Sequence, residues 1–305
     1  MAHPTLRQLM TFLSAVETGS VTAAAKVLHL SQPAASQQLR DLERALRVRL
    51  LDRAKGRVIP TPAGEAILAA ARRAQSAAED IVAAAAEFRD GEAGRVRLGA
   101  GATACIYLLP DILARVKRRM PRLEVTVATG NTADILDRLE AGALDVALVT
   151  QPVRASRAVV QTPLMADRLL ALVPKVLAPA GGAIGAAQLA RLPLILYEAG
   201  GNTRTIVDDW FARAGVAPSP IMELGSVEAI KVLVESGLGA SILPRLSLMR
   251  VARQTVVRPL RPALARELAY VLRKDKVIDR GLRLLLGELT KAAGRTPRRA
   301  GIGAP

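Results

Sequence analysis

The sequence predicts a multidomain chain with a small N-terminal helical domain carrying a β wing, a long linker helix, and two α/β lobes. Three observations predict this. Apolar residues recur at three- and four-residue steps up to residue 46, an alanine-rich heptad pattern follows residue 61, and strand patterns alternate with helix patterns after residue 95. A chain of 305 residues is long enough for two or three such modules, each with its own core.

Residues 20–46 predict two short helices joined by a tight turn, with a further helix over residues 5–18 packed behind them. The second short helix begins at Ser31, whose hydroxyl can cap the free backbone N–H groups of the next turn. Its inner face is one apolar stripe, formed by Ala35, Leu39, Leu42 and Leu46. The spacing therefore indicates a helix-turn-helix with a buried side and a polar side.

The polar side of this helix presents Pro33, Ser36, Gln37, Arg40 and Arg44. Hydroxyl, amide and guanidinium groups can pair with base edges in the major groove of DNA, which is wide enough for a helix. An ordinary amphipathic helix with a solvated face is the alternative, and this helix alone does not separate the two.

A wing is predicted next, because residues 48–59 alternate loosely and turn at Lys55–Gly56. Its cationic residues Arg53, Lys55 and Arg57 are candidates for phosphate contacts.

Residues 5–64 resemble the DNA-binding domain of LysR-type transcriptional regulators. The matching residues are Phe12, Ala15–Ser20, Ala23–Leu28, Ser31–Ser36, Leu39, Leu42–Glu43, Leu50, Arg53 and Thr61–Gly64. One departure is Leu51, where the family usually has phenylalanine. The resemblance implies that Ser31, Gln32, Pro33, Ser36, Gln37 and Arg40 lie at the groove of double-stranded promoter or operator DNA.

The linker helix is predicted to begin after a Thr61 cap, with Pro62 at its first position, and to run to about Phe88. Heptad spacing recurs along it, at Ile67, Ala74, Ile81 and Phe88. The pattern fits a helix that pairs with a second copy of the chain, and it also fits a core helix within one chain. The resemblance favours pairing, and hence a homodimer or homotetramer.

After Arg95 the first lobe is predicted to hold strands at 96–99, 123–128 and 144–149 and helices at 107–120 and 133–140. The second is predicted to hold strands near 169–173, 193–197, 221–224 and 240–243 and helices at 203–214 and 227–235. A strand at 267–272 and a helix at 278–289 end the fold. This alternation favours largely parallel sheets.

The resemblance implies a periplasmic-binding-protein-like effector domain in which the last strand and helix return to the first lobe. The expected domains are residues 1–61 for the winged helix-turn-helix, 62–90 for the linker, 91–293 for the effector domain and 294–305 for a basic flexible tail. Lobe I is expected at about 95–164 and 267–293, and lobe II at about 165–266.

Three glycine-containing loops are candidate ligand sites, at residues 99–103, 129–132 and 197–204. They carry the hydrogen-bonding side chains of Thr103, Asn131, Thr132, Asn202 and Thr203. Ligands of open α/β sheets bind beyond strand ends, where helix N-termini favour anions. Ordinary capping is the alternative for each residue. The resemblance implies an effector in the cleft between the lobes, such as an organic acid or another anion. Tyr197 replaces an arginine found in some members, which disfavours a strongly acidic effector.

Enzymatic function is not expected. One cysteine and two histidines, both histidines within the first 29 residues, cannot assemble a Cys/His nucleophile pair or a histidine-rich zinc site within the lobes. We therefore expect no catalytic residues, no metal and no cofactor. No apolar stretch approaches the roughly 18 residues of a membrane span, no secretory signal is recognisable, and a single cysteine fits the cytoplasm. A cytoplasmic solute-binding protein without gene control is the alternative function.

The net charge of +16 is unevenly distributed. Residues 245–305 hold 15 basic and 4 acidic residues, whereas residues 1–90 hold 12 and 9. Most of the excess therefore lies outside the predicted DNA reader, although residues 40–57 are locally basic. The basic tail is interpreted either as a solvated segment or as a source of nonspecific DNA affinity.

Overall fold

The computed structural model describes residues 3–54, 57–86 and 94–295. The chain forms two compact units, one of residues 1–92 and 138–144 and the other of residues 93–137 and 145–305. The first unit holds the helix-turn-helix and the second holds the two α/β lobes. Within the described residues, no helix combines the length and apolar character that crossing a membrane requires.

Three helices open the first unit: α1 (Leu6–Thr18), α2 (Val21–Val27) and α3 (Gln32–Leu46). Each begins at a hydroxyl residue whose side chain accepts a hydrogen bond from a backbone N–H three residues later, as Ser31 does from Ala34 at 3.3 Å. Phe12, Leu39 and Leu42 are buried between the helices. The predicted helix-turn-helix and the Ser31 cap are confirmed.

The wing consists of two antiparallel strands, β1 (Leu51–Ala54) and β2 (Arg57–Pro60). It is tied to α3 by Glu43, whose carboxylate accepts hydrogen bonds from the backbone N–H groups of Leu50 (2.8 Å) and Leu51 (3.3 Å). The predicted turn at Lys55–Gly56 lies outside the described residues.

The long helix α4 (Pro62–Ala86) begins after Thr61, whose hydroxyl accepts from the Gly64 N–H. A Cβ at Gly64 would lie 2.2 Å from the Leu50 carbonyl oxygen, so the first turn can approach the wing only with glycine there. Ala71 is buried in the three-helix core, and this half of α4 packs within its own chain. Farther along, Ile81 is 71% exposed. The predicted Phe88 end lies outside the described residues.

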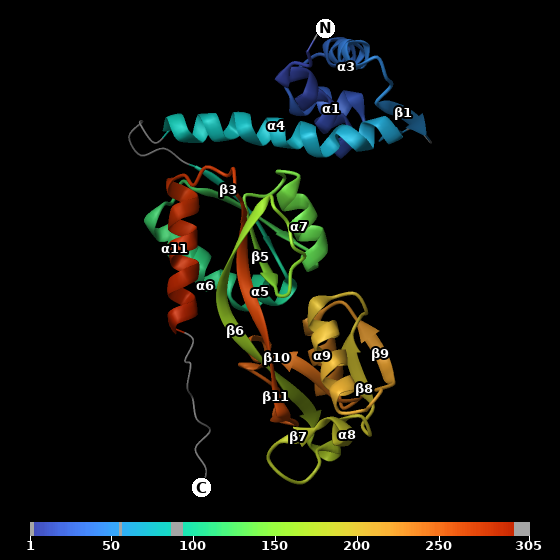
Figure 1. Cartoon of the computed structure of the whole chain (residues 1–305), viewed down its shortest axis with the longest axis vertical. Helices are drawn as coiled ribbons and strands as arrows, with labels where there is room; N and C mark the ends of the chain where they lie inside the picture. Colours follow the sequence, from blue (N-terminus) through green and yellow to red (C-terminus); the bar gives the residue numbers. More distant parts are fainter. Residues whose placement is uncertain (1–2, 55–56, 87–93, 296–305) are drawn as a thin grey trace. The chain divides into compact units, whose positions relative to one another are not determined.

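The second unit is built on one seven-stranded sheet (Figure 1). In lobe I, β3 (Arg95–Ala100) pairs in parallel with β4 (Glu124–Thr129) and β5 (Val146–Thr150). Two long strands, β6 (Val159–Pro174) and β11 (Thr255–Arg273), run antiparallel to each other through both lobes. The expectation of parallel sheets is correct for β3, β4 and β5, but not for β6 and β11, the two strands that join the lobes, which run antiparallel.

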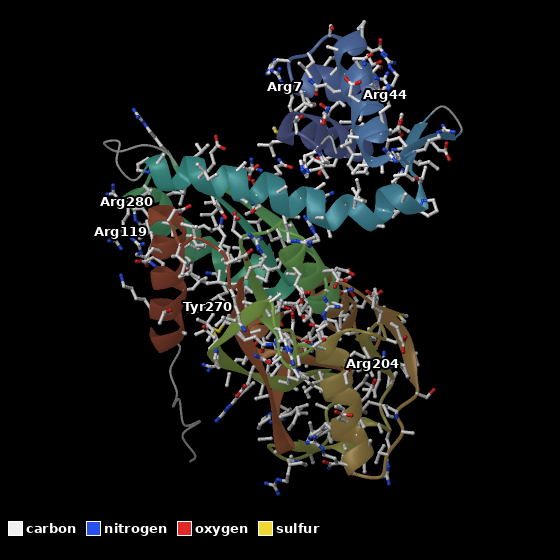
Figure 2. All side chains as sticks on the ribbon, turned by 45° about the horizontal axis from the view of Figure 1, so that its top comes forward. Arg7, Arg44, Arg119, Arg204, Tyr270 and Arg280 are labelled. Carbon is white, nitrogen blue, oxygen red and sulfur yellow. The ribbon has the colours of Figure 1, made fainter. Side chains whose placement is uncertain are left out.

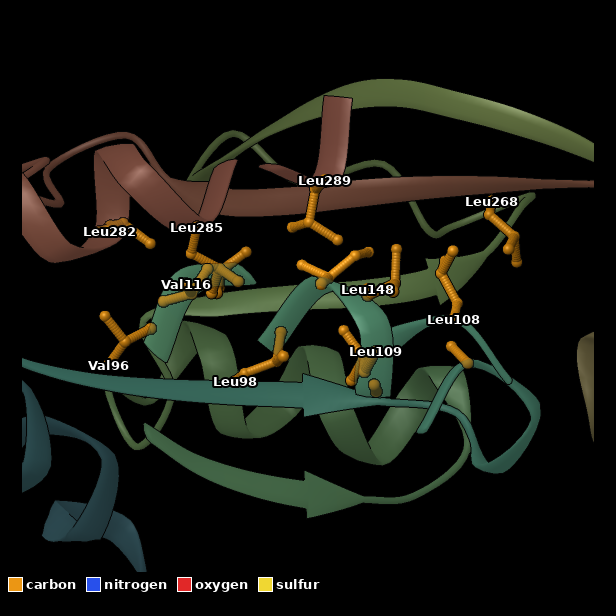
Figure 3. Close-up of a cluster of buried hydrophobic side chains, with 14 of the residues drawn as sticks. Val96, Leu98, Leu108, Leu109, Val116, Leu148, Leu268, Leu282, Leu285 and Leu289 are labelled. Carbon is orange, nitrogen blue, oxygen red and sulfur yellow. The ribbon is translucent and has the colours of Figure 1, made fainter. Parts of the chain in front are cut away.

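Lobe I is covered by α5 (Ala102–Tyr107), α6 (Leu109–Arg119), α7 (Thr132–Glu140) and α11 (Arg280–Arg295). Leucines and valines from α6, α11 and the sheet form its core (Figure 3). The helix predicted over 107–120 is α6, whereas α5, whose six residues are too few to show a helical period, was not predicted. Helix α11 continues past its predicted end at residue 289 to Arg295, since Lys291, Ala292 and Ala293 are good helix formers, so the first two residues of the tail predicted over 294–305 are helical.

Lobe II holds β7 (Ile184–Gly185), α8 (Ala186–Leu189), β8 (Leu194–Tyr197), α9 (Asn202–Arg213), β9 (Pro220–Leu224), α10 (Val227–Glu235) and β10 (Ser241–Pro244). Its core includes Trp210 and Phe211, whose rings pack edge to face with centroids 5.0 Å apart. The strand and helix at 184–189 were not predicted, because they are too short to show a period.

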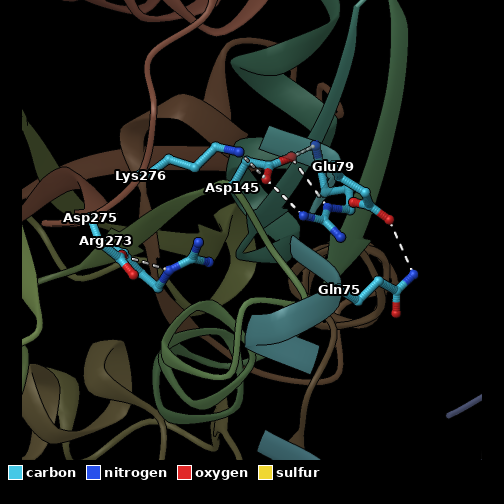
Figure 4. Close-up of polar contacts among 7 residues, drawn as sticks. Gln75, Glu79, Asp145, Arg273, Asp275 and Lys276 are labelled. Atoms are coloured by element: carbon cyan, nitrogen blue, oxygen red, sulfur yellow. Dashed lines mark hydrogen bonds and ion pairs between the residues drawn. The ribbon is translucent and has the colours of Figure 1, made fainter. Parts of the chain in front are cut away.

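A buried carboxylate in lobe I holds two cations (Figure 4). Asp145 accepts hydrogen bonds from the backbone N–H of Arg97 (2.7 Å) and its guanidinium (2.9 Å), and Lys276 Nζ lies 3.0 Å away. Burial opposes ionisation of this carboxyl, but the hydrogen bonds from Arg97 and the charge of Lys276 outweigh it and hold the pKa of Asp145 below its ordinary value. The carboxylate is therefore ionised at neutral pH and forms ion pairs with both cations.

Candidate functional site

The outer face of α3 carries the polar residues predicted to contact DNA. Ser31, Gln32, Pro33, Gln37, Arg40 and Arg44 are exposed, and Ser36 is half-buried. Gln32 Nε2 donates to Ser36 Oγ at 2.9 Å, which pairs the first two turns of the helix. The predicted residues therefore lie on one accessible helix face.

Asp41 organises the second half of this face and was not predicted. Its carboxylate accepts from Gln37 Nε2 (2.8 Å) and from Arg44 (2.8 Å), while Arg40 donates to Gln37 Oε1 (2.7 Å). Arg44 is labelled in Figure 2. The three- and four-residue spacing was a signal that could have shown this network. The network holds the amide and both guanidinium groups side by side.

The wing places Arg53 on β1 and the exposed Arg57 on β2, whereas Lys55 lies outside the described residues. The guanidinium of Arg57 lies against Gly19, where a Cβ would be 3.2 Å from Arg57 Nε. Phosphate contacts by these cationic side chains remain a prediction.

A cleft of about 490 Å³ opens between the two lobes of the second unit. Its lining comes from the start of α5, the turn before α7, the end of β5, the β8–α9 loop and β11. All five predicted effector residues line it: Thr103, Asn131, Thr132, Asn202 and Thr203. The structure thus brings together loops that are about a hundred residues apart in the sequence.

Several of these side chains already have partners. Asn131 caps α7 by accepting from the Asp134 N–H at 2.9 Å. The Asn202 amide donates to the carbonyl oxygens of Thr150 and Pro152, both at 2.7 Å, and so ties lobe II to the end of β5. The capping role that the sequence left open therefore holds for Asn131, while a ligand contact by any of the five stays a prediction.

A buried ion pair forms part of the cleft and was not predicted. Arg266 lies 2.9 Å from Asp167, and it donates to the Thr203 hydroxyl at 3.0 Å. Burial raises the pKa of Asp167 despite the neighbouring guanidinium. These residues come from β11, β6 and α9, and no local sequence pattern could have related positions 99 residues apart.

Arg204 has its charge compensated on two sides. Its guanidinium lies 2.9 Å from Asp208 and 2.8 Å from Glu223, and it also donates to the Tyr197 carbonyl (Figure 2). Although Arg204 lines the cleft, it therefore carries no uncompensated positive charge there.

A second contact joins the lobes beside the cleft. Tyr107 of α5 donates its hydroxyl to Glu228 of α10, and Lys231 Nζ lies 5.6 Å from the Tyr107 ring centroid. These contacts connect lobe I to lobe II through residues more than 100 positions apart in the sequence.

The single cysteine, Cys105, lies near the first loop and is half-buried, with Sγ 3.7 Å from the Thr129 hydroxyl. Burial raises the pKa of this thiol, which lowers the fraction of reactive thiolate. This environment favours a packing role for Cys105 over redox sensing.

Two family models cover nearly the whole chain. Residues 6–65 match the bacterial regulatory helix-turn-helix protein of the LysR family, and residues 89–294 match the LysR substrate binding domain. The chain belongs to the LysR family of transcriptional regulators. It is therefore a DNA-binding regulator with an effector-binding domain, and the family is not enzymatic. The match of residues 6–65 decides against a solute-binding protein without gene control.

Relatives and solved structures agree with this LysR assignment. The chain is 33% identical to the uncharacterized HTH-type transcriptional regulator YeiE of Escherichia coli K12, over 93% of this chain and 96% of that one. It is 36% identical to the HTH-type transcriptional regulator CbbR of Xanthobacter flavus, over 79% and 73%. A single-substitution variant of full-length OxyR from Pseudomonas aeruginosa has a similar structure, with a TM-score of 0.80, 26% identity, and coverage of 99% and 100%.

Proposed function

We propose that the exposed face of α3 and the wing read operator DNA, and that a small organic acid or another anion in the cleft changes this reading. The observation that carries the proposal is that the five predicted loop residues line one cleft of about 490 Å³. Two helices, α5 and α9, begin at that cleft after glycines that supply no side-chain cap. Unpaired N–H groups at such ends favour an anionic ligand.

The DNA contact is supported by the Asp41 network, which holds Gln37 and Arg40 together on the exposed face. We expect Gln37→Ala or Arg40→Ala to weaken binding to a wild-type-selected duplex by about 1–3 kcal/mol, because each removes a base contact. Fluorescence anisotropy at fixed salt measures this. Arg213→Ala removes an exposed cation at the end of α9 and serves as the matched control. Full affinity in both α3 variants would remove this face from the interface.

The effector response is tested at Thr103, which is buried at the start of α5 and lines the cleft. We expect Thr103→Val to abolish the change in DNA affinity that organic acids cause in the wild type, while basal DNA affinity is retained. The same anisotropy assay, titrated with a panel of organic acids, measures it. An unaltered titration would exclude Thr103 from the ligand site.

Dimerisation through α4 is supported by Ile81 and Val82, whose exposed fractions are 71% and 70% in the single chain. Large apolar side chains so exposed on a helix are candidates for a partner helix. Ile81→Glu should shift sedimentation toward the monomer, whereas Glu124→Gln, a charge change at an exposed position of β4, should not. A tetramer would add interfaces outside α4. The DNA-binding function supports a cytoplasmic location.

A further inference from the structure

One hydroxyl in the cleft is buried without a partner. Tyr197, at the end of β8, lines the cleft, and its Oη makes no hydrogen bond with the described residues. Thr103 is the nearest candidate partner, close enough that hydrogen bonding from it would lower the pKa of Tyr197, but the distance and angle between the two hydroxyls do not form a hydrogen bond in this structure. A buried hydroxyl without a partner costs free energy, so its presence in a cleft points to a group that the ligand completes.

The hydroxyl is suited to donate. Burial raises the pKa of Tyr197 to about 12, which keeps the group protonated at neutral pH. A protonated phenol that gives its hydrogen to a ligand needs an acceptor there, such as a carboxylate oxygen.

The start of α9 adds further donors. This helix of 12 residues follows Gly201, which supplies no side-chain cap, so the first backbone N–H groups have no partner within the helix. Asn202, Thr203 and Arg204 all line the cleft. Together with the Tyr197 hydroxyl, these groups form a donor set for one anionic group.

The charged side chains that line the cleft, all within the described part of the chain, include no uncompensated cation for a second negative charge. Both arginines of the lining are already compensated, Arg266 by Asp167 and Arg204 by Asp208 and Glu223. Asp134 and Glu198 line the same cleft and are exposed, with no ion pair among residues that the structure describes. A second negative charge on the ligand would meet these two carboxylates without a free cation to offset them.

We propose that the cleft selects ligands with one carboxylate, bound by the Tyr197 hydroxyl and the N-terminal amides of α9, and that Asp134 and Glu198 exclude dicarboxylates. Tyr197 is then a ligand-binding residue, and the two acids determine specificity by repulsion. The inference rests on the proposed function only in taking this cleft as the effector site.

The first test compares butanoate with succinate, two four-carbon acids that carry one and two charges at pH 7. Their binding to the full chain without DNA is measured by calorimetry or ligand-observed NMR. Butanoate should bind at least tenfold more tightly than succinate. Tyr197→Phe should weaken butanoate binding about tenfold, because it removes a hydrogen bond to a charged acceptor. Tyr270→Phe, on β11 outside the cleft lining, is the matched control.

The second test measures how much more tightly butanoate binds than succinate, rather than the affinity for butanoate alone. Asp134→Asn combined with Glu198→Gln should reduce the preference for butanoate at least fivefold, because the repulsion of the second carboxylate is lost. Glu124→Gln removes an exposed acid of β4 and should leave the preference unchanged. If Tyr197→Phe does not fold, this pair of substitutions still decides the charge selection.

The inference is overturned if neither acid binds, if succinate binds as well as butanoate, or if both sets of variants behave as the wild type. Failure of the proposed function has a different signature. If butanoate binds as expected but leaves operator affinity unchanged, the single-carboxylate site stands and gene control through it does not.

Discussion

The DNA-reading helix and the effector domain differ in how far apart in the sequence their interacting residues lie. On α3, Gln37, Arg40, Asp41 and Arg44 contact one another at spacings of three and four. In the cleft, Asn202 bonds Thr150 across 52 positions and Arg266 bonds Asp167 across 99. Local contacts can be inferred from helix periodicity, whereas long-range contacts depend on the completed fold.

The two regions also differ in exposure. The side chains of the Arg44–Asp41 pair are 68% and 38% exposed, whereas those of Arg266–Asp167 are 6% and 2% exposed. Exposed pairs are screened by water, and removing one partner of a buried pair leaves an unpaired charge. Removing one partner of an ion pair should therefore cost far more stability in the effector domain than on α3.

The largest effect is expected for Asp145→Asn, which leaves Arg97 and Lys276 without their shared carboxylate. We expect a loss of about 3–5 kcal/mol in the unfolding free energy of the effector domain, typical of breaking a buried ion pair. Urea unfolding, followed for that domain's transition, measures it. Asp41→Asn on α3 is the exposed counterpart, and an equal loss there would contradict the distinction between the regions.

Low pH should destabilise the effector domain by protonating its buried, ion-paired carboxylates. The hydrogen bond from Arg115, with a further one from Lys291, lowers the pKa of Glu288 to about 2, and the pKa of Asp145 is also lowered. A carboxyl with a lowered folded pKa stabilises the fold above its unfolded pKa of roughly 4. That contribution is lost as the pH falls toward 2. Urea midpoints measured between pH 5 and 2 should decline, and Glu288→Gln should make the decline shallower.

Removal of the α3 cap should have an intermediate effect. Ser31→Ala takes away the acceptor for the Ala34 N–H, which typically costs about 0.5–2 kcal/mol. Thermal unfolding of the first unit measures it, and Ser31→Asn should restore most of the stability because asparagine also caps. No loss in the alanine variant would mean that the cap contributes nothing at this exposed helix end.

The smallest effect is expected at the wing, where Arg49 and Asp52 lie 3.0 Å apart with side chains 76% and 54% exposed. Asp52→Asn should change stability by less than about 1 kcal/mol, and added salt should reduce even that difference. A larger, salt-insensitive loss, seen in the same thermal assay, would show that exposure is a poor guide to these energies.

The features that could be predicted from the sequence are those held by contacts between residues close together in the chain. Ser31 and the Ala35–Leu39–Leu42 stripe lie within one helix, so the position and the buried side of α3 were predicted correctly. Helix α6 lies within the range predicted over 107–120, whereas the six-residue α5 before it was missed because so short a segment shows no helical period. Predicted strands near 169–173 and 267–272 are only parts of β6 and β11.

The cleft was predicted as a set of loops but not as a chemical environment. Glycine, threonine and asparagine after strands indicated which turns would line it, and all five residues do. The ion pair of Arg266 with Asp167 and the unpartnered Tyr197 hydroxyl depend on where β11, β6 and β8 meet. The periodicity of residues within a strand does not predict which strands will lie next to one another.

The pairing of β6 with β11 through both lobes constrains how the lobes can move. The two strands are paired from Val159–Arg273 in lobe I to Pro174–Thr255 in lobe II, with register shifts between Pro259 and Leu264 and between Leu268 and Ala269. Sliding one lobe along the strands would break this ladder, whereas twisting the pair keeps its hydrogen bonds. The two register shifts mark where the regular ladder is interrupted. We therefore expect any relative motion of the lobes to be a rotation about the β6–β11 pair rather than a translation along it.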